Sequence, residues 1–195
     1  LAPGLYEAFG TDDFDDLYMK YEADKTIPKK SVPAQDLFFD LLKERAETGR
    51  IYIMNLDHCN SHSSFKDKVS MSNLCQEITL PTTPIQDIHD EQGEIALCIL
   101  SAVNVGGLND LSELENICDL SVRALEQIID YQDYPVRAAE VSTKKRRSLG
   151  IGYIGLAHYL AKNNVKYSDP KAWELVDRLS EAFQYHLLRS SCNLA

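Results

Sequence analysis

The sequence predicts an α/β fold, because segments with helical periodicity alternate with short runs typical of buried strands. The clearest helix covers residues 111–131, where apolar side chains recur at helical spacing. The strand-like runs are 50–55, 74–80 and 94–100, each bounded by polar or turn-forming residues. With 44% hydrophobic residues among 195, the chain has enough apolar material for one sizeable core.

Two helices are predicted before the first strand. The first opens on the acidic residues between Asp12 and Asp16, which suit the positive end of the helix dipole. The second runs from about 33 to 47 with an apolar face, and Gly49 is a residue type that commonly ends helices. Residues 57–67 are polar, so we predict a loop there.

The second half of the chain is predicted to be mainly helical. After the helix at 111–131, residues 133–147 are interpreted as a loop that becomes basic at its end. Residues 149–160 are apolar on nearly all sides and are expected to be buried. The last helix, about 170–194, carries Trp173, Val176, Leu179 and Phe183 on one face.

Composition narrows the class of function. The net charge of -10 argues against nucleic acid as the main partner, because phosphate binding needs a basic surface. No apolar run reaches the roughly 18 residues of a membrane helix, and no signal peptide is visible. The chain starts without Met and stops inside a helical pattern, so we expect a fragment or a split-gene product.

Five cysteines are present, an odd number with wide spacing and no CxxC pair. Without a secretory signal, this pattern favours cytoplasmic free thiols over a disulfide framework. His58 and Cys59 with His62 could begin a metal site, but no second pair follows at zinc-finger spacing. We therefore predict no metal site and interpret this stretch as a polar loop, with a thiol- or metal-binding module as an alternative.

Two further patterns have mainly structural interpretations. GIGYIG at 150–155 fits G-x-G-x-x-G, but a dinucleotide site needs a hydrophobic strand before it, and STKKRR precedes it here. We interpret these glycines as sites of close packing, and a dinucleotide-binding oxidoreductase stays an alternative. The basic run 144–147 is interpreted as a solvated face, or otherwise as a contact for a nucleotide phosphate or a partner subunit.

The segment NLCQE at 73–77 is the remaining candidate site. In an extended segment Asn73, Cys75 and Glu77 would point the same way, placing an amide, a thiol and a carboxylate near one small ligand. Alternating polarity is also what any half-buried strand shows, so from these residues alone a polar strand face is the favoured interpretation. Cys98 lies in the apolar run IALCIL, where a buried, inert thiol is expected.

Several segments together resemble the catalytic large subunit of class I ribonucleotide reductases. The resemblance is carried by SNLCQEI (72–78), GEIALC (93–98) and LSAVN (100–104), including the spacing of the two cysteines. It extends to TGRIYI (48–53), DHCN (57–60), DYQDYP (130–135) and RSLGIG (147–152), in the family's order. The likeness covers almost the whole chain and is strongest from Thr48 to Ala161.

The resemblance implies the reduction of ribonucleoside diphosphates to deoxyribonucleoside diphosphates for DNA replication. Cys75 would become a transient thiyl radical that takes the 3′-hydrogen of the ribose. Glu77 would accept the proton of the 3′-hydroxyl as a general base, and Asn73 would hold the ribose hydroxyls, so both would bind substrate. Cys98 would be one half of the dithiol that supplies the electrons and ends as a disulfide.

The resemblance also implies a fold and partners. The chain would be a single piece of a ten-stranded α/β barrel: a helical segment at 1–48, strands and a finger loop with the radical cysteine at 49–110, and helical segments at 111–195. No cofactor would bind to it directly. The radical would come from the metal cofactor of a separate small subunit, and a thiol protein such as thioredoxin or glutaredoxin would restore the dithiol.

Parts that the family needs for turnover have no counterpart in this sequence. No cysteine precedes Cys59, which matches another family segment, so the partner of Cys98 would lie in the remainder of the large subunit. We therefore predict that the isolated chain is inactive. The alternatives are a truncated, non-enzymatic product or a structural half of a split enzyme.

Overall fold

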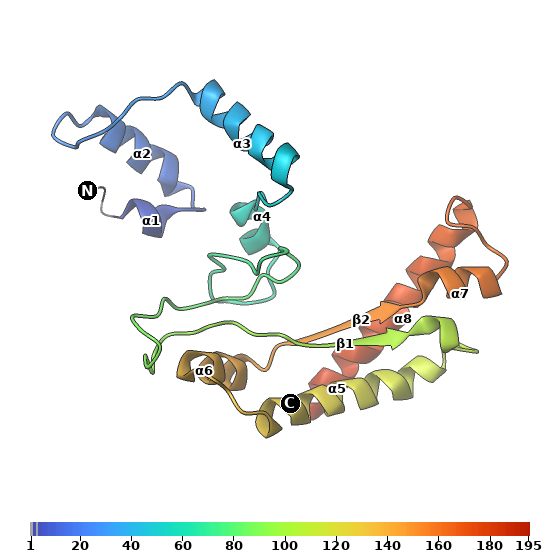
Figure 1. The fold of residues 1–195 in the computed structure, drawn as a ribbon. Coiled ribbons are helices and arrows are strands. Elements are labelled where there is room, and N and C mark those ends of the chain that lie inside the picture. The colour runs from blue at the N-terminus through green and yellow to red at the C-terminus, as the bar shows by residue number, and fades with distance from the viewer. Residues whose placement is uncertain (1, 3) are drawn as a thin grey trace. The chain divides into compact units, whose positions relative to one another are not determined.

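The computed structural model describes residue 2 and residues 4–195, which form two compact units with their boundary between Thr82 and Thr83 (Figure 1). Helices and strands both occur, which agrees with the predicted mixture of helix and strand. Among the described residues, no helix is long and apolar enough to cross a membrane.

The first unit contains four helices in its described part: α1 (Leu5–Ala8), α2 (Asp13–Ala23), α3 (Ala34–Thr48) and α4 (Leu56–Ser61). Phe14 of α2 packs edge-on against Phe9, with ring centroids 5.5 Å apart, and stacks on Tyr18 at 6.1 Å. Gly49 ends α3 as predicted, because its backbone takes the left-handed conformation (φ 66°) and its N–H donates to Arg45.

The strand predicted at 50–55 is wrong, since these residues are irregular. A strand requires a neighbour for its backbone N–H and C=O groups. The described residues of the first unit form no strand that could pair with this run. Local β propensity was therefore not sufficient here.

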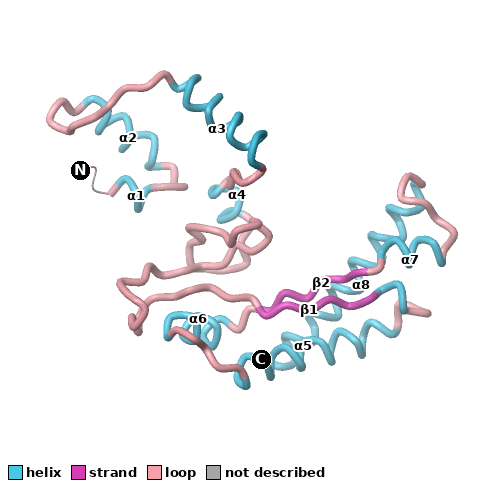
Figure 2. The backbone as a smooth tube through the Cα atoms, in the orientation of Figure 1, coloured by secondary structure: helices cyan, strands magenta, loops and turns pink. Residues whose placement is uncertain are grey.

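The second unit is built on two parallel strands, β1 (Ile99–Asn104) and β2 (Leu149–Ile154), drawn in magenta in Figure 2. Their register pairs Ile99 with Leu149 and Asn104 with Ile154. Parallel neighbours need a long crossover connection. Here the connection contains a short 3-10 turn η1 (Val105–Gly107) and the helices α5 (Glu113–Tyr131) and α6 (Arg137–Arg146).

Two further helices, α7 (Leu156–Lys162) and α8 (Pro170–Leu194), follow β2. The core lies where α5, α8 and one face of the strands meet, and Cys118 on α5 is fully buried against α8. Its buried residues are Val103, Val105, Leu108, Leu114, Cys118, Tyr159, Leu179 and Phe183. The predicted helices at 111–131 and 170–194 are thereby confirmed, with Leu179 and Phe183 buried and Trp173 75% exposed.

The two faces of the strand pair differ. Side chains alternate along a strand, and Val103, Ile151 and Tyr153 point into the core. The other face leaves Leu100 66% and Ile154 57% exposed. The sheet therefore has one face packed on helices and one face that the described residues leave largely open. The burial expected over residues 149–160 is wrong for the side chains on that open face, such as Ile154.

Two predicted elements of the second unit differ from the structure. The strand predicted at 94–100 begins only at Ile99 and continues to Asn104, because β2 offers partners only over that range. The loop predicted at 133–147 contains α6 instead. This helix lacks a strong apolar periodicity, but ion pairs from Glu140 to Arg137 (2.7 Å) and Lys144 (2.8 Å) support it at helical spacing.

The core position of Leu114 predicts a large effect of its truncation. Leu114→Ala removes a side chain with no exposed surface and should lower the free energy of unfolding by about 3 kcal/mol. Leu120→Ala is the matched control, because Leu120 lies on the same helix but is 57% exposed. Urea denaturation followed by circular dichroism measures both variants, and equal losses would contradict the core described here.

Candidate active site

The Asn73–Glu77 segment forms a closed loop rather than a strand. The N–H of Asn73 donates to the carbonyl of Ile78 (3.3 Å), and the N–H of Ile78 donates back to Asn73 Oδ1 (3.1 Å). Gln76 takes a left-handed conformation (φ 62°), and its N–H donates to the carbonyl of Asn73 (3.2 Å). The strand predicted at 74–80 is therefore wrong, and Cys75 lies exposed in the turn of this loop.

The loop brings two of the candidate side chains together. The amide Nδ2 of Asn73 donates a hydrogen bond to Oε1 of Glu77. The two side chains do not meet because they lie on one face of an extended strand, as predicted. They meet because the turn at Leu74 and Cys75 folds the segment back on itself. An amide and a carboxylate thus lie on the two arms of a loop that carries an exposed thiol.

Asn60 on α4 fixes the position of Val69, in the segment just before this loop. Its side-chain amide donates to the carbonyl of Val69 (2.8 Å), and its Oδ1 accepts from the N–H of Val69 (2.8 Å). Both backbone groups of Val69, a fully buried residue, are thereby satisfied as they would be by a neighbouring strand. The sequence did not identify Asn60 as a positioning residue, and only the resemblance of the DHCN string to a family segment marked its place.

Cys98 belongs to the second unit and lies just before β1. Its thiol is half-buried, and burial raises the pKa of this thiol above its ordinary value. Next to it, a Cβ at Gly150 of β2 would lie 2.6 Å from Cys98 Sγ. Because Cys98 and Leu100 are both within 2.6 Å of that Cβ position, the thiol lies on the open face of the strand pair.

A buried carboxylate fixes the segment that leads to Cys98. Glu94, 3% exposed, accepts hydrogen bonds from Lys145 Nζ (2.8 Å), Arg146 Nη2 (2.8 Å) and Thr83 Oγ1 (3.0 Å). Burial raises the pKa of Glu94, but these hydrogen bonds and the charge of Arg146 outweigh it and lower the pKa to about 2. Glu94 therefore stays ionised, as a fully paired buried charge.

The basic run 144–147 binds acids of its own chain. Lys144 pairs with Glu140, and Lys145 and Arg146 pair with Glu94. The interpretation as a solvated face is wrong for Arg146, whose side chain is 9% exposed. The basic run lies at the end of α6, next to the segment that contains Glu94. Lys145 and Arg146 therefore point towards this buried carboxylate.

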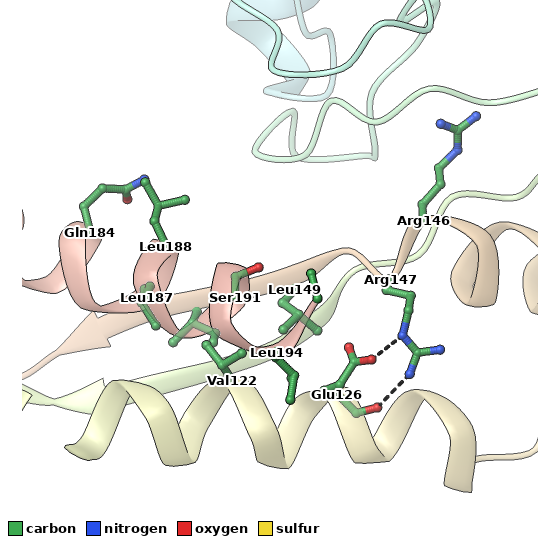
Figure 3. Close-up of a pocket in the computed structure, with 12 residues that line it drawn as sticks. Val122, Glu126, Arg146, Arg147, Leu149, Gln184, Leu187, Leu188, Ser191 and Leu194 are labelled. Atoms are coloured by element: carbon green, nitrogen blue, oxygen red, sulfur yellow. Dashed lines mark hydrogen bonds and ion pairs between the residues drawn. The ribbon is translucent and has the colours of Figure 1, made fainter. Parts of the chain in front are cut away.

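Arg147, at the end of α6, binds two acidic residues of α5. It forms ion pairs with Glu126 and with Asp130 (2.8 Å), and Figure 3 shows the contacts with Glu126. Beside it lies a cavity of about 440 Å³ between α5, β2 and the end of α8, lined largely by apolar side chains such as Val122, Leu149 and Leu187. Leu149 and Gly150 point to opposite faces of β2, so this cavity lies on the face away from Cys98.

The other sequence patterns find structural roles. Gly150 and Gly152 lie within β2 and Gly155 precedes α7 with φ 80°, so the glycine pattern spans a strand instead of following one. This arrangement lacks the strand–turn–helix context of a dinucleotide site. The interpretation as close packing is confirmed at Gly150 and at Gly155, where a Cβ would meet Asn104 Oδ1 at 2.3 Å, but it is wrong for Gly152, where a Cβ would meet nothing within 4 Å.

His58, Cys59 and His62 lie on or next to α4, so the loop predicted at 57–67 is wrong for residues 57–61. His62 Nδ1 is 3.0 Å from the carbonyl of His58, and His58 is paired with Asp57 at 3.8 Å. Within the described part of the chain, no group of three or more His, Cys, Asp or Glu side chains is arranged to hold a metal ion. The geometry therefore offers nothing in favour of the metal-binding alternative.

The ion pairs of Glu94 predict a pH effect on stability. The folded-state pKa lies below the ordinary value of 4.5, so the pairs contribute fully above about pH 4.5 and their contribution is lost as the pH falls towards 2. Glu94→Gln should lower the free energy of unfolding by about 3 kcal/mol at neutral pH, because it removes the carboxylate that binds the buried guanidinium of Arg146. It should also flatten the decline between pH 4.5 and 2.

Glu140→Gln is the control, because Glu140 forms ion pairs on α6 without contacting the Glu94 segment. Urea denaturation of the three proteins across that pH range provides the measurement. Parallel pH curves for the original chain and Glu94→Gln would show that Glu94 is not the titrating group.

Comparison with known proteins identifies the relatives of this chain. The model of the ribonucleotide reductase barrel domain family matches residues 2–195. Among curated proteins, the chain is 58% identical to the ribonucleoside-diphosphate reductase subunit alpha of Haemophilus influenzae and 55% identical to that of Buchnera aphidicola from Schizaphis graminum. It is 53% identical to ribonucleoside-diphosphate reductase 1 subunit alpha of Escherichia coli K12.

Each of these alignments covers 100% of this chain and 26% of the relative, so the chain spans about a quarter of their length. The match begins at residue 2 and ends at residue 195, and it includes both the Asn73–Glu77 loop and the strand pair beside Cys98. The chain belongs to the ribonucleotide reductase barrel domain family.

Proposed function

We propose that this chain is part of the catalytic large subunit of a class I ribonucleotide reductase, which reduces ribonucleoside diphosphates to deoxyribonucleoside diphosphates. The observation that carries the proposal is the closed loop in which Asn73 and Glu77 are hydrogen-bonded beside the exposed Cys75. The names of the relatives, ribonucleoside-diphosphate reductase subunit alpha, agree with this reaction.

Each side chain of the loop has one task in the proposed reaction. Cys75, as a thiyl radical, takes the 3′-hydrogen of the ribose, and sulfur suits this step because it can lose and regain a hydrogen atom. Glu77 accepts the proton of the 3′-hydroxyl as a general base. Asn73 holds the ribose hydroxyls and, through its bond to Glu77, keeps the carboxylate oriented.

Cys98 supplies reducing equivalents in the same proposal. With a second thiol from the remainder of the large subunit it forms a disulfide, which a thioredoxin- or glutaredoxin-type protein reduces again. The position of Cys98 on the open face of the strand pair supports this task. In an α/β barrel the helices cover the outside, so the face without α5 and α8 would line the interior, where the substrate binds.

We further propose that both units belong to one ten-stranded α/β barrel, with the Asn73–Glu77 loop as its finger loop. Cys75 and its neighbour Leu74, which is 82% exposed, lack cover in the isolated chain. A thiyl radical would be quenched in such an exposed position. The remainder of the large subunit must enclose it, and the small subunit with its metal cofactor must supply the radical, so the isolated chain is expected to be inactive.

Substitution in the complete enzyme tests the reaction. In a full-length large subunit containing this chain, assayed with its small subunit and a thiol reductant, Cys75→Ser should abolish deoxyribonucleotide formation. Glu77→Gln should lower turnover by about 10² to 10⁴-fold, the usual contribution of a general base. Cys192→Ser, at an exposed thiol on α8, is the control and should keep full activity. Turnover by the Cys75→Ser enzyme would refute the mechanism.

The open strand edges predict how the isolated chain behaves. β1 and β2 pair only with one another in the described residues, so each has an unpaired edge, and such edges favour association. The isolated chain should therefore form concentration-dependent oligomers or aggregates in size-exclusion chromatography. A monomer that withstands concentration and dilution would count against a partial barrel.

A further inference from the structure

Gly150 lies so close to Cys98 that any side chain at this position would force a neighbouring side chain to shift. A Cβ at this position would lie 2.6 Å from Cys98 Sγ and 2.6 Å from Leu100 Cδ2. Carbon and sulfur atoms in contact are normally separated by more than 3 Å, since closer approach is strongly repulsive. Even alanine at position 150 would therefore displace the thiol, Leu100 or the strand itself.

The backbone conformation does not explain this glycine. Gly150 does not have a positive φ, unlike Gly155, whose φ is 80°. Glycine inside a strand lowers stability compared with alanine, because it loses more conformational freedom on folding. The contact with Cys98 and Leu100 gives this otherwise unfavourable residue a physical reason.

The chain around Cys98 has little freedom to move away. Before the cysteine, the N–H of Ile95 donates to the carbonyl of Ala138 (3.1 Å), and Glu94 is bound by Arg146. After it, the N–H of Ile99 donates to the carbonyl of Ser148 (3.1 Å). The segment carrying the thiol is therefore held to α6 and to the start of β2 on both sides of Cys98.

We propose that Gly150 is a positioning residue for Cys98: its missing side chain leaves the space that the thiol occupies and sets its exposure on the open face of the strand pair. The relevance to dithiol chemistry rests on the proposed function, whereas the placement of the thiol does not. In this position the thiol is half-buried, and burial raises its pKa, so it stays protonated until it and its partner thiol reduce the ribonucleotide and are themselves oxidised together to a disulfide.

The reactivity of Cys98 tests the proposal in the full 195-residue chain. Alkylation of each cysteine by iodoacetamide is followed by mass spectrometry, with the exposed Cys192 as the internal reference. Gly150→Ala should move the Cys98 thiol towards solvent and lower its pKa. Freer access to the thiol and a larger thiolate fraction near pH 7 should together make alkylation of Cys98 several-fold faster.

Gly152→Ala is the matched control. Gly152 lies two residues further along the same face of β2, but a Cβ there would meet nothing within 4 Å. This variant should leave the rate and pH profile of Cys98 unchanged. An unchanged or slower rate in Gly150→Ala would overturn the proposal, because the thiol would then stay in place beside the added methyl group.

A double substitution keeps the proposal testable if Gly150→Ala folds poorly. In a Cys98→Ala background the sulfur is absent, so Gly150→Ala should lower the melting temperature less than it does in the original chain. Equal losses in both backgrounds would overturn the coupling between Gly150 and Cys98. These readouts need no reductase activity, so failure of this inference is distinguishable from failure of the proposed function.

Discussion

The second unit depends on the parallel pairing of β1 with β2. Parallel strands cannot be joined by a tight turn, so this pairing requires the connection through α5 and α6, and α5 then covers one face of both strands. The same pairing places Gly150 beside Cys98, although the two are far apart in the sequence. The core, the open face and the position of the thiol all follow from this register.

The buried carboxylate of Glu94 adds a second constraint to that arrangement. An ionised group in the interior is tolerated only when its charge is paired, and Lys145 and Arg146 at the end of α6 provide the partners. The ion pairs tie the segment before β1 to the segment before β2. A basic run that could have formed a phosphate contact is thereby occupied in holding the strand pair together.

The proposed chemistry is divided between two kinds of local structure. The Asn73–Glu77 loop is closed by short-range hydrogen bonds of its own, and its thiol is exposed. Cys98 is half-buried and its surroundings come from distant parts of the chain. An exposed thiol suits a group that the rest of a larger subunit encloses, whereas a half-buried thiol suits a reductant that must stay protonated until it reacts.

The sequence by itself determined the long helices, since α5 and α8 follow from apolar periodicity and α3 ends at Gly49 for a local, conformational reason. It also identified NLCQE and Cys98 as the candidate site, through the order and spacing of several segments. Only the tertiary structure decided which apolar runs are strands, because a strand needs a partner and the run at 50–55 has none within its unit's described residues. Tertiary contacts likewise turned Arg146 inward and gave Gly150 its role, since both depend on neighbours that are distant in sequence.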